Sequence, residues 1–199
     1  MDPEGVIVRI AGQQDEQYAE AISAETERSA IERGSGISQR PASCIIQKMR
    51  EGKAVIAISE TGEWAGFSYI EVWSNGEFVS NSGLIVSPAF RGSGVAAGIK
   101  ALIFELGRQL YPDARIFSIT TGLAIMKMNA RLGFEPVTFN EITRDAAFWE
   151  GCRSCVNFNI LESKKCKNCL CTAMLYTPPV MRKSCKKGKS PGTRTTNHT

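Results

Sequence analysis

The sequence has a single histidine, His198, close to its C-terminal end. A Ser–His or Cys–His nucleophile pair in the preceding chain is therefore excluded, because both need an imidazole base. Zinc sites that use histidine are excluded for the same reason. The chain also has no apolar run approaching the roughly 18 residues of a transmembrane helix, so we expect no membrane partner.

Outside residues 180–199 the chain has no excess of positive charge. The 199 residues carry a formal net charge of +4, but residues 180–199 hold six Lys and Arg residues and no acid. The other residues hold 18 basic and 20 acidic side chains. We expect a disordered basic tail at 180–199. Since the preceding part shows no basic stripe interleaved with aromatics, nucleic-acid binding is disfavoured.

The N-terminal sequence MDPEGVIVRI has no basic region followed by a long apolar stretch. It therefore does not resemble a secretory signal, and we expect a cytoplasmic protein. A hydrophobic content of 43% is sufficient for a core, and the length suits one domain, alone or with an appendage.

The hydrophobic pattern predicts a mixed sheet with helices on its faces, which is an α+β (α/β mixed sheet) fold. Strands are predicted at 6–11, 54–59, 65–73, 78–86, 116–121 and 137–139, and helices at 15–33, 41–49, 95–110 and 124–132. Tight turns join the strands from 54 to 86, so these three must be antiparallel neighbours. The strongest turn signal is Asn75-Gly76, which suits a positive φ.

A glycine-rich segment, VSPAFRGSGVAAGIK, joins the strand ending at Val86 to the next helix. Glycines at a helix start allow close approach of the backbone to a ligand, and the free N–H groups of the first turn favour an anion. A dinucleotide site is one reading, because residues 92–97 fit G-x-G-x-x-A and Asp113 follows about 20 residues on. That reading needs the first glycine directly after a parallel strand, and residues 87–91 intervene.

A second reading starts from R-x-x-G-x-A at residues 91–96. The string VSPAFRGSGVA, together with the later NARLGF at 129–134, resembles the two motifs of the GNAT N-acetyltransferases. The resemblance implies a GNAT-like acyl-CoA N-acyltransferase fold, acetyl-CoA or another acyl-CoA as co-substrate, and a pyrophosphate held by backbone N–H groups. It implies that the cofactor-binding residues are Leu84, Ile85, Val86, Arg91, Gly92, Ser93, Gly94, Val95, Ala96 and Asn129. The pantetheine arm would lie along residues 84–86, in a slot opened by splaying of the strand at 116–120.

Three further strings, GLIVSPAFRG, TTGLAIMKMN and SCVN, resemble a subgroup of GNAT proteins from Bacteroidetes that is associated with arginine biosynthesis. This resemblance implies an acetyl or succinyl donor and the α-amine of glutamate as acceptor.

The chemistry needs an oxyanion donor, a base for the amine and a proton for the thiolate. A backbone N–H near residue 85 or 86 can serve the oxyanion. The family places a tyrosine, the usual proton donor, five residues before the Phe of its Gly-Phe motif, and this chain has Asn129 at that position. An asparagine amide can hydrogen-bond the sulfur but cannot protonate it, so we expect Asn129 to act only through hydrogen bonding. Water would then protonate the thiolate. For the base we favour Glu71, then Glu77, then Ser82 or Ser80 acting through a water.

The predicted partner is a small-molecule amine acceptor, and an acidic one would suit two arginines. Arg33 and Arg40 flank the hydroxyl-bearing turn between the first two helices, and arginine forks bind carboxylates. These two residues are the predicted substrate-binding residues. Whether the chain forms a homodimer stays open.

Five cysteines are grouped between residues 152 and 171, namely Cys152, Cys155, Cys166, Cys169 and Cys171. Two C-x-x-C pairs can form a four-thiolate zinc site with one cysteine to spare, but buried thiols and a redox or iron–sulfur role stay open. The predicted division is an acyltransferase domain at 1–145, a Cys-rich extension packed on it at 146–179 and the tail. The alternative to catalysis is a CoA-binding sensor or interaction module with a metal-stapled C-terminal segment.

Overall fold

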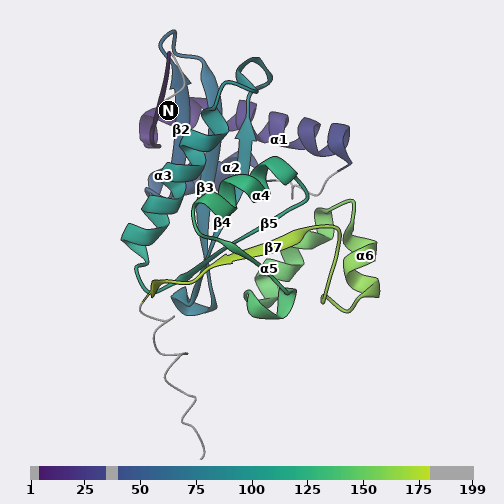
Figure 1. Ribbon diagram of the computed structural model, residues 1–199. Coiled ribbons are helices and arrows are strands. Elements are labelled where there is room, and N and C mark those ends of the chain that lie inside the picture. Colours follow the sequence, from purple (N-terminus) through teal and green to yellow (C-terminus); the bar gives the residue numbers. More distant parts are fainter. Residues whose placement is uncertain (1–4, 35–39, 180–199) are drawn as a thin grey trace, which may run out of the picture.

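The computed structural model describes residues 5–34 and 40–179 and shows a seven-stranded mixed sheet with helices on both faces (Figure 1). The spatial order is β1-β2-β3-β4-β5-β7-β6. The strands are β1 Val6–Ile10, β2 Ala54–Ser59, β3 Trp64–Trp73, β4 Phe78–Val86, β5 Arg115–Thr120, β6 Glu135–Val137 and β7 Thr172–Tyr176. The predicted α+β class is confirmed.

The helices differ greatly in length. The α-helices are α1 Ala19–Arg33, α2 Ala42–Arg50, α3 Val95–Leu110, α4 Leu123–Arg131, α5 Ala146–Glu150 and α6 Phe158–Ser163. Short 3-10 turns are η1 Gln13–Tyr18, η2 Ser74–Gly76, η3 Pro88–Phe90, η4 Phe139–Glu141 and η5 Gly151–Ser154. None of the helices in the described ranges is long and apolar enough to cross a membrane. The tail predicted at 180–199 lies outside the described residues.

Two predicted boundaries were wrong because of local capping. The helix expected from residue 15 is a 3-10 turn up to Tyr18, since the Asp15 side chain accepts a hydrogen bond from the Gly12 N–H at 2.9 Å and pairs with Arg9 at 2.7 Å. The last predicted strand ends at Val137 rather than residue 139. There Thr138 and Glu141 form a capping box that begins η4.

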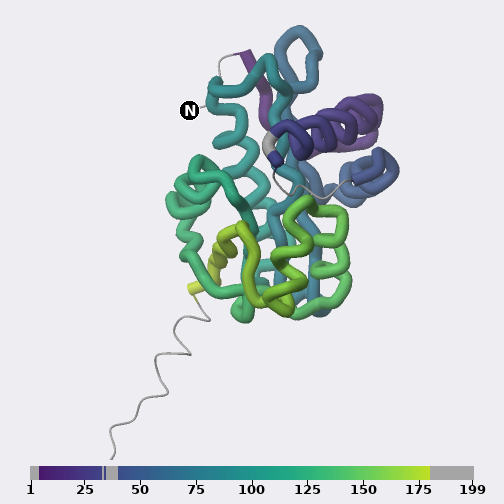
Figure 2. The backbone as a smooth tube through the Cα atoms, turned by 90° about the vertical axis from the view of Figure 1, so that its right-hand side faces the viewer, coloured from purple at the N-terminus to yellow at the C-terminus, as the bar shows by residue number. Residues whose placement is uncertain are grey.

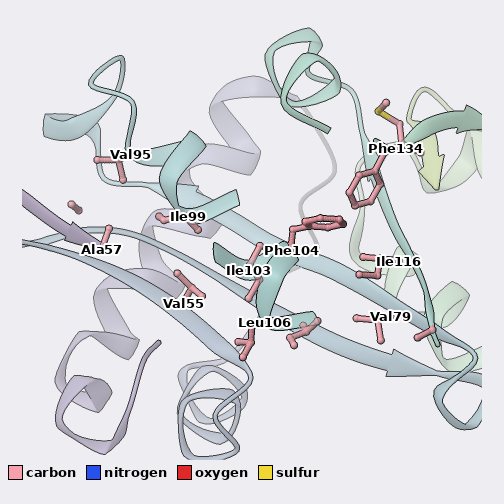
Figure 3. Packing of buried hydrophobic residues seen from close by; sticks show 14 of the residues in the cluster. Val55, Ala57, Val79, Val95, Ile99, Ile103, Phe104, Leu106, Ile116 and Phe134 are labelled. Carbon is pink, nitrogen blue, oxygen red and sulfur yellow. The ribbon is translucent and has the colours of Figure 1, made fainter. Parts of the chain in front are cut away.

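Alternating residues of the strands divide the core between the two faces of the sheet. Val55 and Ala57 of β2 pack with the long helix α3, as Figure 3 shows, whereas Ala54 and Ile56 pack with α1 and α2. This alternation is expected of a sheet buried on both faces. The sheet therefore has an α3 face and an α1–α2 face.

The strand β7 was not predicted from the sequence. It comes from the Cys-rich segment and inserts between β5 and β6, pairing antiparallel with both. Residues 138–171 thus form an insertion between two hydrogen-bonded strands. Phe117, Ala173 and Leu175 pack beneath this insertion, and Figure 2 shows the green segment on the same side of the sheet as α1 and α2.

Candidate functional site

The neighbouring strands β4 and β5 are paired over only part of their length. Their parallel ladder joins Phe78 to Arg115, Val79 to Ile116 and Ser80 to Phe117, and it stops there. Beyond this point β4 continues beside β3, and β5 continues beside β7. The sheet is therefore open between residues 81–86 and 118–120, two residues later along β5 than the sequence suggested.

A cavity of about 390 Å³ passes through this gap. Its walls between the two faces come from both open strands, including Asn81 to Leu84 of β4 and Ser118 to Thr120 of β5. At one end it is lined by Ile22 and Thr26 of α1, and at the other by Lys100 of α3 and Ile125 of α4. A ligand in this cavity can therefore contact both faces of the sheet.

The loop at the N-terminus of α3 presents unused backbone donors. Gly92 and Gly94 have φ of 84° and 92°, a region that other residues rarely adopt, and nothing lies within 4 Å of a Cβ built on either. Within the described residues, none of the N–H groups from 92 to 96 donates a hydrogen bond. Open glycines and free N–H groups at the start of a 16-residue helix are the components of a phosphate site.

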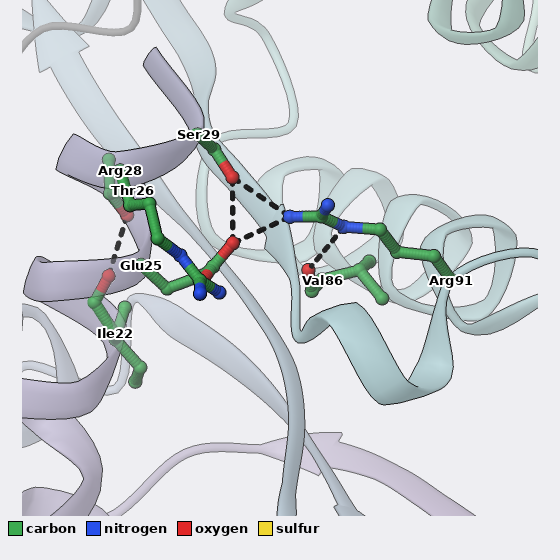
Figure 4. Close-up of polar contacts among 7 residues, drawn as sticks. All are labelled: Ile22, Glu25, Thr26, Arg28, Ser29, Val86 and Arg91. Carbon is green, nitrogen blue, oxygen red and sulfur yellow. Dashed lines mark hydrogen bonds and ion pairs between the residues drawn. The ribbon is translucent and has the colours of Figure 1, made fainter. Parts of the chain in front are cut away.

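The side chain of Arg91 is directed away from this loop, toward α1 (Figure 4). Its Nη2 lies 2.5 Å from Glu25 Oε1 and 2.9 Å from Ser29 Oγ, and its Nε donates to the Val86 carbonyl at 3.3 Å. Burial opposes the charge of Glu25, but hydrogen bonds from Ser29 and Arg28 hold its pKa below the ordinary value. Arg91 thus fixes the loop to α1, and its guanidinium does not occupy the space in front of the free N–H groups.

A bulge distorts β4 beside the gap. Tyr69 of β3 pairs with Ser82 and Phe67 pairs with Ile85, so β4 has one residue more than β3 over this stretch. Gly83 has a φ of 62°, and a Cβ built on it would lie 2.3 Å from the Tyr69 ring. The bulge therefore needs glycine for its conformation and for its contact with the ring.

Glu71 and Arg40 face the cavity on the α1–α2 side. Arg40 Nη2 lies 3.7 Å from Glu71 Oε2, and Lys48 Nζ lies 3.8 Å from Glu71 Oε1. Arg40 Nε also donates to the Tyr69 hydroxyl at 2.7 Å, and burial raises the pKa of Tyr69 to about 12, so this hydroxyl stays neutral. The Glu71 Oε2 atom is buried and accepts no hydrogen bond from the described residues.

Ser80 and Ser82 continue the polar lining of the same side. The Trp73 indole N–H donates to Ser80 Oγ at 2.8 Å, and the two serine hydroxyls lie 2.9 Å apart. The indole N–H is only a donor, so Ser80 Oγ accepts from it and can donate its own proton to Ser82 Oγ. The hydroxyl of Ser82 can then donate a hydrogen bond to a ligand in the cavity.

Several residues predicted for the site lie elsewhere. Asn129 is fully buried, is not among the lining residues, and directs its Nδ2 at Met174 Sδ, 3.6 Å away. Glu77 is exposed at the end of the β3–β4 hairpin and pairs with Arg115. The side chain of Arg33 lies outside the described part of the chain.

Four of the five cysteines line the cavity, namely Cys152, Cys155, Cys169 and Cys171. The zinc prediction is not supported, because no three His, Cys, Asp or Glu side chains among the described residues, which include all five cysteines, are arranged to hold a metal ion. Three of the lining thiols pack on the aromatic cluster around Phe117. Burial, with the nearby sulfurs, raises the pKa of Cys152 to about 11 and that of Cys171 to about 12, so both remain neutral thiols.

The polar lining residues that were not predicted from the sequence include Tyr69, Asn81 and Lys100. Two of them had a signal in the sequence. The run Ser-Asn-Ser at 80–82 interrupts an otherwise apolar buried strand, and Lys100 lies beside the apolar stripe of a helix. Nothing in the sequence distinguishes Tyr69 from other core aromatics.

No protein-family model matches this chain, and no curated protein matches it in sequence. Solved structures do match its fold. N-acetylglutamate synthase from Neisseria gonorrhoeae, complexed with coenzyme A and N-acetyl-glutamate, is 17% identical with a TM-score of 0.59, over 87% of this chain and 35% of the synthase. This chain therefore spans about a third of the synthase's length.

Two further matches cover most of both chains. Rv2747 from Mycobacterium tuberculosis, in complex with CoA, is 20% identical with a TM-score of 0.60, over 86% of this chain and 98% of that one. A GNAT superfamily phosphinothricin acetyltransferase from Sinorhizobium meliloti, in complex with AcCoA, is 13% identical with a TM-score of 0.58, over 87% and 89%. The chain thus has the fold of the GNAT acetyltransferases.

Proposed function

We propose that this protein is an N-acyltransferase that moves an acyl group from acyl-CoA to a primary amine. The observation that carries the proposal is the cavity through the β4–β5 gap. This cavity adjoins α3, and the free N–H groups of residues 92–96 lie at the N-terminal end of that helix. Such a cavity allows a thioester on one face of the sheet to meet an amine on the other.

The donor side needs few cations. Backbone N–H groups and the α3 dipole hold the pyrophosphate, and the pantetheine arm extends along β4 at 84–86. The Arg91–Glu25 contact acts as a positioning element, because it fixes the loop without occupying the anion position.

The reaction forms a C–N bond and breaks the C–S bond. A backbone N–H at the β4 bulge donates to the oxyanion, which lowers the barrier to attack. The amine proton passes to Glu71, directly or through Ser82, since both line the cavity on the α1–α2 side. The thiolate takes its proton from water. A Glu71→Gln variant should lower kcat/KM and lose the fall in kcat/KM at low pH that comes from protonation of the base, and unchanged pH dependence would remove Glu71 from the mechanism.

An acidic amine, such as glutamate bound through its carboxylates, suits the acceptor end. Arg40 lines the cavity and Lys48 lies close behind Glu71, so cations outnumber the single carboxylate there. The likeness to a structure complexed with N-acetyl-glutamate points in the same direction.

A donor-by-acceptor screen tests the function. Free thiol release from acetyl-CoA and succinyl-CoA would be measured with glutamate, ornithine and a polyamine, and the acylated amine identified by mass spectrometry. The proposal expects turnover that needs both donor and amine. CoA binding by calorimetry with no turnover for any amine would instead identify a CoA sensor, and absence of both would reject the function.

A further inference from the structure

Lys100 is a buried cation that lines the cavity from α3. It is 2% exposed on α3, and within the described residues its ammonium makes no hydrogen bond or ion pair. The ring of Phe134, whose centroid lies 5.7 Å from Nζ, is its one charge-related contact there. Burial lowers the pKa of Lys100 to about 8. A desolvated ammonium of this kind is costly unless an anion compensates it.

Asn81 is a second unpartnered polar group in the same cavity. It is 8% exposed, and neither its Oδ1 nor its Nδ2 has a hydrogen-bond partner among the described residues. It follows Ser80, the last residue of β4 that pairs with β5, so it lies at the closed end of the gap. Buried amides are normally satisfied, and an orphaned one lining a cavity indicates a polar ligand.

The topology places these two residues on one side of the sheet. Asn81 pairs with Ile70 and follows Val79 by two residues, and both of these pack with α3. Along α3, Lys100 lies between Val95, which is close to Gly66, and Gly107, which faces Val79. The two side chains therefore line the α3 end of the cavity, across the sheet from Arg40 and Glu71.

We infer that Lys100 and Asn81 bind a carboxylate at the far end of the acyl group. The donor would then be the CoA monothioester of a dicarboxylic acid, of the succinyl class. The inference rests on the proposed function. A pantetheine arm that runs from the start of α3 along 84–86 reaches Ser82 and Asn81 next, so the acyl chain enters the closed end of the gap.

A carboxylate suits this end of the cavity better than an acetyl methyl group or a transient thiolate. It can accept from the Lys100 ammonium and from Asn81 Nδ2 together, which satisfies both buried donors. An acetyl group leaves both without partners. A thiolate, which forms only as the C–S bond breaks, would compensate Lys100 but leave the Asn81 amide unexplained.

The test compares two stable thioethers that differ in charge, S-(3-carboxypropyl)-CoA and S-butyl-CoA, by calorimetry without acceptor. We expect the carboxylated compound to bind at least about tenfold more tightly, the scale of one charge-assisted hydrogen bond. Lys100→Met should abolish the preference. Lys127→Met, at an exposed position of α4, is the matched control and should retain it.

Turnover of succinyl-CoA and butyryl-CoA with an accepted amine should show the same preference in kcat/KM. Equal affinities of the wild-type protein for both thioethers would overturn the carboxylate site while leaving the acyltransferase proposal intact. A Lys100→Met variant that slows both donors equally would also overturn it and would assign Lys100 to the thiolate. Failure of CoA and both thioethers to bind would reject the function itself.

Discussion

The donor and acceptor sides of the β4–β5 gap are assembled in different ways. In the proposed function, the part of the donor side that holds the CoA moiety consists of consecutive residues, 84–96, and its chemistry is that of the backbone. The acceptor side brings together Arg40, Glu71 and Cys155 from three distant segments, one of them an insertion between paired strands. A local motif thus predicts the CoA-binding part of the donor side, whereas the acceptor side depends on long-range packing.

The largest expected effect is on the backbone of the donor side. Replacing Gly92 and Gly94 together by valine should weaken CoA binding by roughly 100-fold, because β-branched residues are strained at positive φ and a side chain would cover the free N–H groups. Calorimetry measures the change. Ser93→Ala, which removes only the hydroxyl bond to the Phe90 carbonyl, should bind CoA nearly as the wild type does.

The next effect concerns the bulge in β4 at Gly83, which lines the cavity between the donor and acceptor sides. Gly83→Ala should lower the free energy of unfolding by about 2.5 kcal/mol, since its Cβ would meet the Tyr69 ring and its φ is positive. Urea unfolding at neutral pH measures the loss. Gly62→Ala has a similar φ but nothing within 4 Å, so a loss equal to that of Gly83→Ala would refute the importance of the ring contact.

A smaller effect concerns Lys100 and pH. The pKa of Lys100 is about 8 in the folded protein, whereas the ordinary value, expected for the unfolded chain, is 10.5. Between pH 8 and pH 10.5 the unfolded chain therefore binds more protons at this residue than the folded protein does. The free energy of unfolding consequently rises with pH across this range. Wild type should gain about 2 kcal/mol relative to Lys100→Met between pH 8 and 9.5.

The thiols of Cys152 and Cys171 oppose this rise above about pH 9, since their raised native pKa values make folding less favourable as the unfolded thiols ionise. They are present in both proteins, so the difference isolates Lys100. A constant difference across this range would contradict the buried, unpartnered ammonium.

The smallest effect belongs to the acceptor side. Arg40→Ala should raise the acceptor KM several-fold and leave the KM for acyl-CoA nearly unchanged, because Arg40 lies across the sheet from the α3 loop. Arg50→Ala, an exposed arginine paired with Glu16, is the control. Equal changes in both KM values would indicate that Arg40 stabilises the fold and does not bind the acceptor.

The sequence predicted what local chemistry determines. The Arg91–Ala96 motif, the Asn75-Gly76 hairpin and the amphipathic α3 helix are each specified by neighbouring residues. The strand β7 was not predicted because Thr172–Tyr176 is a short segment in a cysteine-rich region. Its pairing partners lie more than thirty positions away in the sequence. Orphaned groups such as Asn81 can be recognised only once the packing around them is known.

The proposed function depends on backbone N–H groups at the start of α3 holding a diphosphate. The most direct measurement is a titration of ¹⁵N-labelled protein with CoA, followed by amide NMR shifts. We predict the largest shifts at residues 92–96, with smaller ones along β4 at 84–86. Saturating CoA that leaves the 92–96 amides unshifted would contradict the account.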